Sequence, residues 1–405
     1  MGIFSRQVPV STDEKRIDEL LSRSISQVLP TREELKKALM SGKRLKFYIG
    51  TDATGPQLHL GHSTNYLILE QFRRLGHEII ILFGDYTALI GDPTDKEAAR
   101  QQQTPAQVAE HVKNWKKQVE KIVNFTDREN PAQILKNSTW LSKLSFENLI
   151  DIASNFTVQH MLERDMFEKR IEAGKPVYLH EFFYPLMQGY DSVAMNVDVE
   201  MGGTDQTFNM LAGRILQRRY NNKDKFVVST TLLENPLTGK KLMSKSEGNY
   251  IALNDSPSDM FGKTMALADE VIKQVFIDCT LLSMREIERI TSGHPKEAKL
   301  HLGVEIVSMY HSKDVAQKAK EDWENTFSKG GTPEEIPTHT VGKDTPMLMA
   351  LAEALGESNA NIRRLFQQTA VSEVNGEIIH DSLTPITRPI TLRIGKHRFL
   401  KILVK

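Results

Sequence analysis

The sequence predicts an α/β protein, in which a first domain built on a parallel β-sheet is followed by an α-helical domain and a small α+β domain. Two observations predict the sheet. Apolar runs that end at glycine are typical of strands buried on both faces, and they alternate with amphipathic helical segments. A strand, a helix and a second strand also follow one another closely near the N-terminus, and such a βαβ unit requires parallel strands.

Local patterns predict the first elements in order. Helical apolar spacing predicts a leading helical segment over 14–40. A short strand at 45–50 and a helix over 60–75 follow it. The continuous apolar run 78–84 then predicts the second strand of the βαβ unit.

The central part of the chain departs from this alternation. An amphipathic helix is predicted to open at Thr104-Pro105, and residues 125–180 are mostly helical in pattern, as an insertion would be. Strands are predicted at 197–201 and 225–230 with a helix between them, and residues 257–327 are predicted to be helical throughout.

These patterns predict four parts of the chain. They are an α/β domain at 1–231 with a helical insertion at about 104–180, a helical domain with a lysine-rich loop at 232–327, a linker at 328–346 and a small domain at 347–405. The linker is predicted by its content of glycine, proline, threonine and glutamate.

Bulk composition excludes several classes of protein. Lysine plus arginine and aspartate plus glutamate both number 52, so the chain as a whole does not attract nucleic acid and any RNA surface must be local. The single cysteine, Cys279, excludes an internal disulfide and suits a reducing compartment. Because no secretory signal and no apolar stretch of membrane-spanning length is present, we predict a cytoplasmic protein without a membrane partner.

The segment 52–62 has the features of a phosphate-binding turn. It follows a predicted strand, and ligands of parallel sheets sit beyond the carboxyl ends of strands. Gly50, Gly55 and Gly61 allow close approach of a nucleotide to the backbone. The helix that begins near Leu60 directs its free N–H groups and its positive dipole end at the same place.

His59 and His62 can add hydrogen-bond donors to phosphate oxygens. Two other interpretations stay open, namely a capping or core pair, or half of a His-x-x-His metal site. No cysteine and no other histidine-rich spacing completes such a site, so we predict no structural metal.

A second segment, 240–249, is rich in lysine. It holds three lysines and two serines between two glycines, namely Lys240, Lys241, Lys245, Ser244 and Ser246 between Gly239 and Gly248. Glycine hinges suit a mobile clamp that closes on a triphosphate. The alternative is a basic hairpin exposed to solvent, since runs of charged residues usually lie on the surface.

Together and in this order, the two segments resemble the paired signatures of class I aminoacyl-tRNA synthetases. The first is similar to the HIGH motif, with Leu60 at its second position. The second is similar to the KMSKS motif, except that Leu242 stands where the first lysine belongs, which leaves open whether Lys241 or Lys240 replaces it. The resemblance implies a Rossmann-like catalytic domain, an anticodon-side helical domain and ATP with Mg²⁺ as substrate. It implies five catalytic residues: His59, His62, Lys241, Ser244 and Lys245.

A second group of polar residues predicts a site for a small polar molecule. Tyr184, Gln188 and Asp191 lie at i, i+4 and i+7 of a predicted helix, which places them on one face. Asp92 and Gln206 both follow predicted strands, and an acid with an amide suits an α-ammonium group. The alternative is a solvated helical face.

The strings 48–52, 184–191 and 202–206 resemble tyrosyl-tRNA synthetases of bacterial type. The resemblance implies that Tyr48 and Asp191 bind the substrate hydroxyl, that Asp92, Tyr184 and Gln188 hold the ammonium group, and that Gln206 lies close to the amino acid. It implies that ATP contacts Gly50, Asp52, His59, Gly61, His62, Gly203, Asp205, Met243 and Lys245. Two positions depart from the family pattern, Thr207 and Ile49.

The same resemblance implies a reaction and its partners. L-Tyrosine and ATP give tyrosyl-adenylate and pyrophosphate, and the tyrosyl group then passes to tRNA(Tyr). Dimerisation of two identical chains through the helical insertion is also implied.

The C-terminal module is the candidate RNA-binding part. A basic helix carries Arg363 and Arg364, and a hairpin with an Asn-Gly turn is predicted at 371–377. The chain from Pro385 onward is basic without an acidic residue, and its alternation predicts strands with one basic face. The module resembles a small RNA-binding domain shared with a ribosomal protein, with Arg363, Arg364, Arg393, Lys396 and Arg398 as RNA-binding candidates. The alternative is a solubilising basic end.

Two rival functions remain at this point. A tryptophanyl-type synthetase shares the fold, although Tyr48, Asp191 and the RNA module argue against it. A synthetase-like RNA-binding protein without catalysis is kept open by the altered lysine loop.

Overall fold

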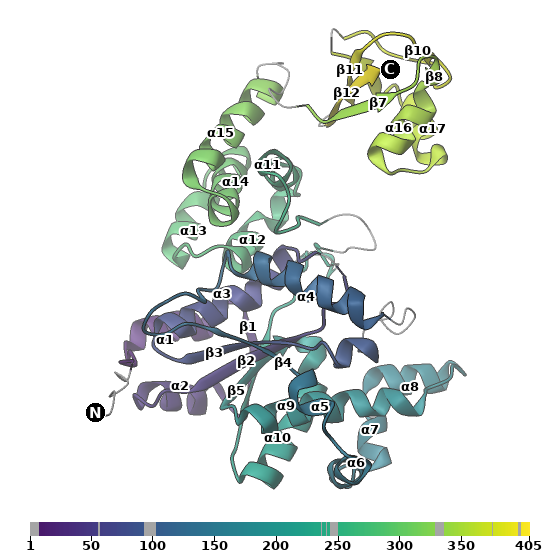
Figure 1. Ribbon diagram of the computed structural model, residues 1–405. Helices are drawn as coiled ribbons and strands as arrows, with labels where there is room; N and C mark the ends of the chain where they lie inside the picture. Colours follow the sequence, from purple (N-terminus) through teal and green to yellow (C-terminus); the bar gives the residue numbers. More distant parts are fainter. Residues whose placement is uncertain are drawn as a thin grey trace. The chain divides into compact units, whose positions relative to one another are not determined.

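The structure is a computed structural model, shown in Figure 1. It describes residues 8–55, 57–92, 103–235, 237–239, 241–243, 250–328, 336–374, 376–395 and 398–405. The chain divides into two compact units. The first comprises Met1–Asp255 and Leu267–Tyr310, and the second comprises Ser256–Ala266 and His311–Lys405.

The first unit is built on a sheet that has six strands in the described part of the chain, in the order β1-β6-β5-β2-β3-β4. The strands are β1 (Ile25–Leu29), β2 (Lys46–Thr51), β3 (Glu78–Phe83), β4 (Gln133–Lys136), β5 (Val199–Gly203) and β6 (Phe226–Thr230). The pairs from β6 to β4 are parallel, and β1 joins β6 in the antiparallel direction. The predicted parallel sheet and the Rossmann-like fold class are confirmed.

The strand order reverses between β2 and β5. From β2 the chain builds outward through β3 and β4, whereas β5 and β6 lie on the other side of β2. In an open parallel sheet such a reversal leaves a crevice at the carboxyl ends of the two strands. Those ends are followed by Asp52 and by Asp205, two residues predicted to bind ATP.

Helices cover both faces of this sheet (Figure 1). Helices α3 (Leu60–Arg74) and α4 (Pro105–Val119) lie on one side, and α9 (Phe183–Met195) and α10 (Thr207–Asn221) lie on the other. A Cβ atom at Gly189 of α9 would lie 2.9 Å from Leu216 Cδ1 and 3.1 Å from the Gly213 nitrogen of α10. The missing side chain at Gly189 therefore lets α9 and α10 pack closely. This contact helps to fix the position of α9, which carries three of the predicted tyrosine-binding residues.

The remaining helices of the first unit frame this core. They are α1 (Glu14–Ser22), α2 (Arg32–Met40), α5 (Ser138–Leu141), α6 (Phe146–Ala153), α7 (Val158–Leu162), α8 (Asp165–Glu172), α12 (Ile272–Cys279), α13 (Met284–Thr291) and α14 (Pro295–Tyr310). The predicted opening of the helix at Thr104-Pro105 is confirmed, because Thr104 caps α4 and its side chain accepts from the Gln107 nitrogen.

Two predictions about elements were wrong. Residues 25–29 form β1 rather than part of a leading helical segment, because a bulge in this strand buries Ile25 and Val28, three positions apart, which imitates a helical repeat. Residues 133–136 form β4 inside the stretch predicted to be mostly helical. This edge strand has only four residues and no buried side chain, so it lacks the apolar alternation that would predict it.

The second unit contains α11 (Pro257–Met265), α15 (Lys313–Trp323) and a small α+β module. Its sheet has the order β7-β12-β11-β9, with β7 (Thr338–Val341), β9 (Val371–Glu373), β11 (Ile390–Ile394) and β12 (Arg398–Val404). A short pair joins β8 (Thr345–Pro346) to β10 (Pro385–Ile386). Helices α16 (Met347–Leu355) and α17 (Asn359–Gln367) share one apolar core with the sheet.

Two predictions from the sequence concern this module. The strand β7 lies in the segment predicted to be a linker and pairs with β12 in parallel, so this part of the segment is structured. An antiparallel bridge between Ser372 and Ile378 agrees with the predicted hairpin, whose Asn375 lies outside the described residues. The predicted domain boundaries themselves remain predictions.

Candidate functional site

The first motif segment pairs with the residues that directly follow the lysine-rich segment. The Leu60 nitrogen donates to the Ile251 carbonyl at 3.1 Å, and the Leu253 nitrogen donates to the Leu58 carbonyl at 2.9 Å. The hydroxyl of Tyr250 donates to Gln57 at 2.8 Å. The chain that follows the lysine-rich segment therefore pairs, like a short strand, with the chain that leads into α3.

The two histidines have a defined arrangement at the start of α3. His59 is the N-cap residue, and its Nδ1 accepts from the Gly61 nitrogen at 3.1 Å. The Nδ1 of His62 accepts from the His59 nitrogen at 3.1 Å. Because Nδ1 of each ring is an acceptor, the proton of each neutral imidazole belongs on Nε2. The capping interpretation is therefore confirmed, and it leaves both Nε2 protons available for the donor role, which stays a prediction.

Helix α4 holds the turn that precedes these histidines. Three of its side chains, at i, i+4 and i+7, bond backbone groups of that turn. His111 Nδ1 lies 3.1 Å from the Ala53 carbonyl, Trp115 donates to the Gly55 carbonyl at 2.5 Å, and Gln118 accepts from the Leu58 nitrogen at 2.9 Å. Sequence reasoning missed these three contacts. The spacing of His111, Trp115 and Gln118 could have indicated that α4 presents three polar groups on one face.

Asp52 is fixed by two hydroxyl groups. Tyr184 donates to its Oδ2 at 2.9 Å, and Thr87 of the short helix η1 (Thr87–Leu89) donates to its Oδ1 at 2.7 Å. A Cβ atom at Gly84 would collide with Asp52 Oδ1 and Thr87 Oγ1, so any other residue at this position must displace these side chains. Burial raises the pKa of Asp52 to about 7, and the two donors oppose that rise.

Asp92 collects two donors at the place where an ammonium group is predicted to bind. Gln206 donates to its Oδ2 at 2.6 Å, and Arg164 donates to its Oδ1 at 3.2 Å. Arg164 is buried, and its guanidinium lies 5.7 Å from the ring centroid of Phe167. The structure therefore brings the predicted Asp92 and Gln206 together and adds an arginine that sequence reasoning missed.

Gln188 contacts an acid of the neighbouring strand β5. Its Nε2 donates to Oε1 of Glu200 in β5 at 3.0 Å. Its predicted role toward the substrate ammonium group remains a prediction.

The predicted hydroxyl-binding pair is buried. Asp191 accepts from Trp140 at 2.7 Å and from Asn137 at 3.2 Å. Tyr48 lies 2.9 Å from Ser192 Oγ through its hydroxyl, and it packs in one apolar cluster with Trp140. Burial raises the pKa of both Tyr48 and Asp191, and the donors on Asp191 oppose its rise.

A buried ion pair lies next to Tyr48. Lys225 contacts Oε2 of Glu200 and donates to Ser192 Oγ at 2.9 Å, while Ser192 donates to Glu200 at 3.2 Å. Burial lowers the pKa of Lys225, and the Glu200 charge opposes this. A Cβ atom at Gly213 of α10 would lie 2.7 Å from Ser192 Oγ, so glycine makes room for the group. The charged Glu200 within the otherwise apolar strand β5 could have indicated this ion pair from the sequence.

The remaining predicted nucleotide residues lie at the ends of β2 and β5 and beside α3. Burial raises the pKa of Asp205, and the nearby charge of Lys241 opposes this rise. A Cβ atom at Gly203 would lie 2.5 Å from Asp205 Oδ1, and one at Gly61 would lie 3.7 Å from Met243 Cβ. A Cβ atom at Gly50 would lie 3.9 Å from its nearest neighbours, which is an ordinary van der Waals contact. Lys240, Ser244 and Lys245 lie outside the described residues.

The C-terminal sheet separates its predicted basic residues. Arg393 pairs in register with Phe399 and lies exposed next to the Thr391–Lys401 pair. Arg398 pairs with the buried Ile394, and its guanidinium donates to Glu357 at 2.6 Å. Arg363 and Arg364 lie in α17, and Lys396 lies outside the described residues. The basic face of this sheet is therefore formed by Arg393 and Lys401, and Arg398 belongs to the opposite side.

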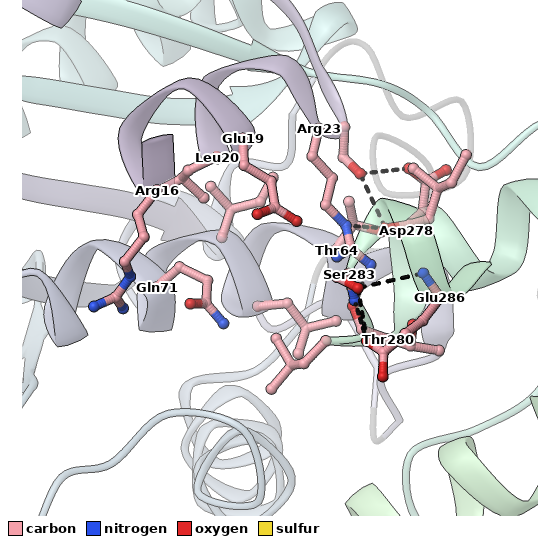
Figure 2. A pocket seen from close by; sticks show the side chains of 15 residues that line it. Arg16, Glu19, Leu20, Arg23, Thr64, Gln71, Asp278, Thr280, Ser283 and Glu286 are labelled. Carbon is pink, nitrogen blue, oxygen red and sulfur yellow. Dashed lines mark hydrogen bonds between the residues drawn. The ribbon is translucent and has the colours of Figure 1, made fainter. Parts of the chain in front are cut away.

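A separate cavity of about 280 Å³ lies between α1, α3 and the α12–α13 turn (Figure 2). Arg23 closes one end of it by donating to the carbonyls of Ile277, Leu282, Phe276 and Thr280, which caps α12. Arg16 and Gln71 lie at the other end. The described residues that line it include none of the predicted site residues.

Two kinds of feature are absent from the described residues. No group of three or more histidine, cysteine, aspartate or glutamate side chains among them is arranged to hold a metal ion. None of the helices in the described ranges combines the length and apolar content needed to cross a membrane.

Comparison with known proteins identifies the family. Residues 40–328 match the family model described as tRNA synthetases class I (W and Y). The chain is 40% identical over 411 residues to the tyrosine--tRNA ligase of Carboxydothermus hydrogenoformans, covering 96% of this chain and 98% of that protein. It is 41% identical over 400 residues to the tyrosine--tRNA ligase of Desulfotalea psychrophila, covering 95% and 97%.

The chain belongs to the tyrosyl-tRNA synthetases of class I. The predicted family, enzyme class and two-step aminoacylation reaction are therefore confirmed. ATP, tyrosine and tRNA are the substrates of this family.

Solved structures support the same fold. A C-terminally truncated mitochondrial tyrosyl-tRNA synthetase from Aspergillus nidulans matches with a TM-score of 0.66 at 23% identity, over 77% of this chain and 94% of that one. The tyrosyl-tRNA synthetase of Archaeoglobus fulgidus, complexed with L-tyrosine, matches with a TM-score of 0.58 at 22% identity, over 76% and 99%.

Proposed function

We propose that this enzyme activates L-tyrosine with ATP and then charges tRNA(Tyr) at its 3′-terminal ribose. The observation that supports this most strongly is the pairing of residues 57–60, which follow β2, with residues 250–253, which follow the lysine-rich segment. A buried phenol and a buried acid, Tyr48 and Asp191, lie in the same unit.

Tyrosine would bind with its hydroxyl between Tyr48 and Asp191 and its ammonium group at Asp92, Tyr184 and Gln188, with Gln206 adjacent. Burial supports this assignment, because polar groups removed from water discriminate strongly against a ligand that leaves them unpaired. Tyrosyl-tRNA synthetases are themselves the standard example of this effect, with a preference of roughly 10⁵-fold for tyrosine over phenylalanine that belongs to the family and does not follow from this structure.

ATP would lie across the start of α3. The two Nε2–H groups of His59 and His62 and the dipole of α3 suit negative charge that builds on the phosphates. Gly50, Asp52, Gly203, Asp205 and Met243 would line the nucleotide, and Ser244, Lys245 and Lys241 would act on its phosphates. Mg²⁺ would arrive bound to ATP and neutralise phosphate charge.

The first step requires little from the protein beyond the positioning of tyrosine and ATP. The tyrosine carboxylate is already a competent nucleophile toward the α-phosphorus, so no general base is required. Positioning and stabilisation of developing charge would supply the rate enhancement.

The C-terminal module would contact the tRNA. Exposed Arg393 and Lys401 share one face of its sheet with the ring of Phe399. The phosphate backbone of the tRNA would contact the two cations on this face, and a base could stack on the ring. Arg363 and Arg364 of α17 are further candidates.

We also propose a cytoplasmic homodimer formed through the helical insertion. Three large apolar side chains of this region are mostly exposed in the single chain, with relative exposures of 78% for Phe146, 68% for Val158 and 73% for Leu179. Large apolar side chains left exposed in one region of the chain are typical of an interface. Sedimentation velocity should find a dimer that Phe146→Asp with Val158→Asp converts to monomer.

An amino-acid panel in ATP–pyrophosphate exchange tests the main proposal. Exchange that depends on tyrosine alone is expected. Exchange with tryptophan instead would assign a tryptophanyl enzyme, and tRNA binding without any exchange would assign a catalytically inactive RNA-binding protein.

A further inference from the structure

Tyr48 is joined to a buried ion pair through one serine. Ser192 Oγ lies 2.9 Å from the Tyr48 hydroxyl, 2.9 Å from Lys225 Nζ and 3.2 Å from Glu200 Oε2. All four side chains are buried. Ser192 follows Asp191 directly, so the group lies beside the predicted hydroxyl-binding pair.

The chemistry of these groups limits where the protons can be. An ammonium group only donates and a carboxylate only accepts, whereas a hydroxyl has one proton and two acceptor positions. Lys225 must therefore donate to Ser192, and the single Ser192 proton must go either to Glu200 or to Tyr48.

Two proton arrangements follow. In the first, Ser192 donates to Glu200, and Tyr48 donates to Ser192. In the second, Ser192 donates to Tyr48, and the Tyr48 proton is available to a ligand. Glu200 keeps Lys225 and Gln188 as donors in both arrangements, so neither leaves its carboxylate without hydrogen bonds.

We propose that Ser192, held by Lys225, donates to Tyr48 rather than to Glu200 when tyrosine is bound, and is therefore a positioning residue that makes Tyr48 a hydrogen-bond donor to the hydroxyl of the bound tyrosine. The substrate hydroxyl then accepts from Tyr48 and donates to Asp191, which completes one continuous chain of hydrogen bonds. This inference rests on the proposed role of Tyr48 in reading the substrate.

Removing the serine hydroxyl has a specific consequence. Without the Ser192 hydroxyl, the nearby Glu200 carboxylate becomes an acceptor for the Tyr48 proton, which then turns away from the ligand. Tyr48 and Asp191 then both require the one proton of the substrate hydroxyl. Phenylalanine has no hydroxyl, so its activation is unaffected by this conflict.

The test compares Ser192→Ala and Tyr48→Phe in pyrophosphate exchange, with tyrosine and phenylalanine as substrates. We expect Ser192→Ala to lower the tyrosine-to-phenylalanine ratio of kcat/KM by about tenfold or more, the size of one buried hydrogen bond. Tyr48→Phe should lower it at least as much. The double variant should match Tyr48→Phe alone, because both changes break the same chain.

Two controls separate positioning from packing. Ser229→Ala removes another buried hydroxyl, which bonds Thr207, and should leave the ratio unchanged. Ser192→Cys keeps the side-chain volume while replacing the strong donor by a weak one, so it should lower the ratio even if the alanine variant folds poorly.

Other outcomes overturn the inference in distinguishable ways. Equal losses for both amino acids in Ser192→Ala would assign Ser192 a merely structural role. A normal ratio in Ser192→Ala and Ser192→Cys beside a lowered ratio in Tyr48→Phe would reject the serine and leave the site standing. An unchanged ratio in Tyr48→Phe would reject the proposed role of Tyr48 itself.

Discussion

The hydroxyl of Tyr184 donates to Oδ2 of Asp52 across 2.9 Å. Sequence reasoning assigns Tyr184 to the ammonium group of tyrosine and Asp52 to the nucleotide, so this bond joins the two halves of the predicted site. Thr87 binds the other oxygen of the same carboxylate, and Asn137 donates both to Thr87 and to Asp191. The acid at the nucleotide side is thus connected by hydrogen bonds to the acid at the hydroxyl side.

Asp52 should make the stability of the protein depend on pH. Burial raises its pKa to about 7, so the native state holds this proton more tightly than the unfolded state does. The stabilisation from protonated Asp52 is full at low pH and is lost as the pH rises from about 4 through about 7. Asp52→Asn removes this titration. The Tm of the variant relative to wild type should therefore increase by roughly 2 °C or more between about pH 5 and about pH 8.

Thermal melts of both proteins across this range check the prediction. Glu33→Gln serves as the control, because it removes a carboxylate from an exposed position of α2. A Tm difference that stays constant from acid to base would show that Asp52 is ionised throughout.

Asp191→Asn should impair the use of tyrosine selectively. The amide keeps an acceptor for Trp140 but presents an NH₂ group where Asn137 already donates, and it lacks the charge that would receive the substrate proton. The loss of a hydrogen bond to a charged group predicts that kcat/KM for tyrosine falls about 10- to 150-fold. Phenylalanine should be affected much less. Pyrophosphate exchange with both amino acids measures this, and equal losses would contradict it.

Lys241 and Lys240 can be separated by matched alanine variants. The charge of Lys241 opposes the rise in the pKa of Asp205, a residue that is predicted to bind ATP. We therefore expect Lys241→Ala to lower kcat of pyrophosphate exchange by about 10- to 100-fold with little change in the KM for tyrosine. Lys240→Ala should retain most of its activity. The reverse result would assign the missing motif lysine to position 240.

Deletion of residues 336–405 should abolish charging of tRNA while sparing pyrophosphate exchange. The cut is placed before β7 because this strand pairs with β12, and a cut at residue 345 would leave it as an unpaired edge. Aminoacylation and exchange assays on the truncated chain provide the measurement. Arg393→Ala with Lys401→Ala is the finer test, since loss of phosphate contacts should weaken tRNA binding and reduce its salt dependence. Full charging by the truncated chain would exclude an RNA role for the module.

Strands with continuous apolar runs were predictable because burial on both faces imposes that composition. This holds best for β3, whose five residues after Glu78 are all apolar and buried. The same composition is not imposed on the edge strands β1 and β4. In β1 a bulge sets buried residues three apart, and β4 buries no side chain, so neither shows the period of two that predicts a strand.

Spacing within one helix predicted part of the candidate site. Tyr184, Gln188 and Asp191 do lie on α9, but they contact Asp52, Glu200 and the Trp140–Asn137 pair, which come from three separate segments. Contacts of this kind join residues far apart in sequence, and periodicity carries no information about them. For that reason Asn137, Trp140 and Arg164, all from the region between β4 and α8, could not be anticipated.

The carboxylate of Asp52 occupies the space where a side chain at Gly84 would begin. Every amino-acid replacement at that position must therefore displace the acid, and with it the hydroxyls of Tyr184 and Thr87. Gly50 is different, since a methyl group there would meet its nearest neighbours only at 3.9 Å. In a saturation library of this gene, codon 84 should accept glycine alone, whereas codon 50 should tolerate alanine for folding and reveal any further restriction only under selection for aminoacylation.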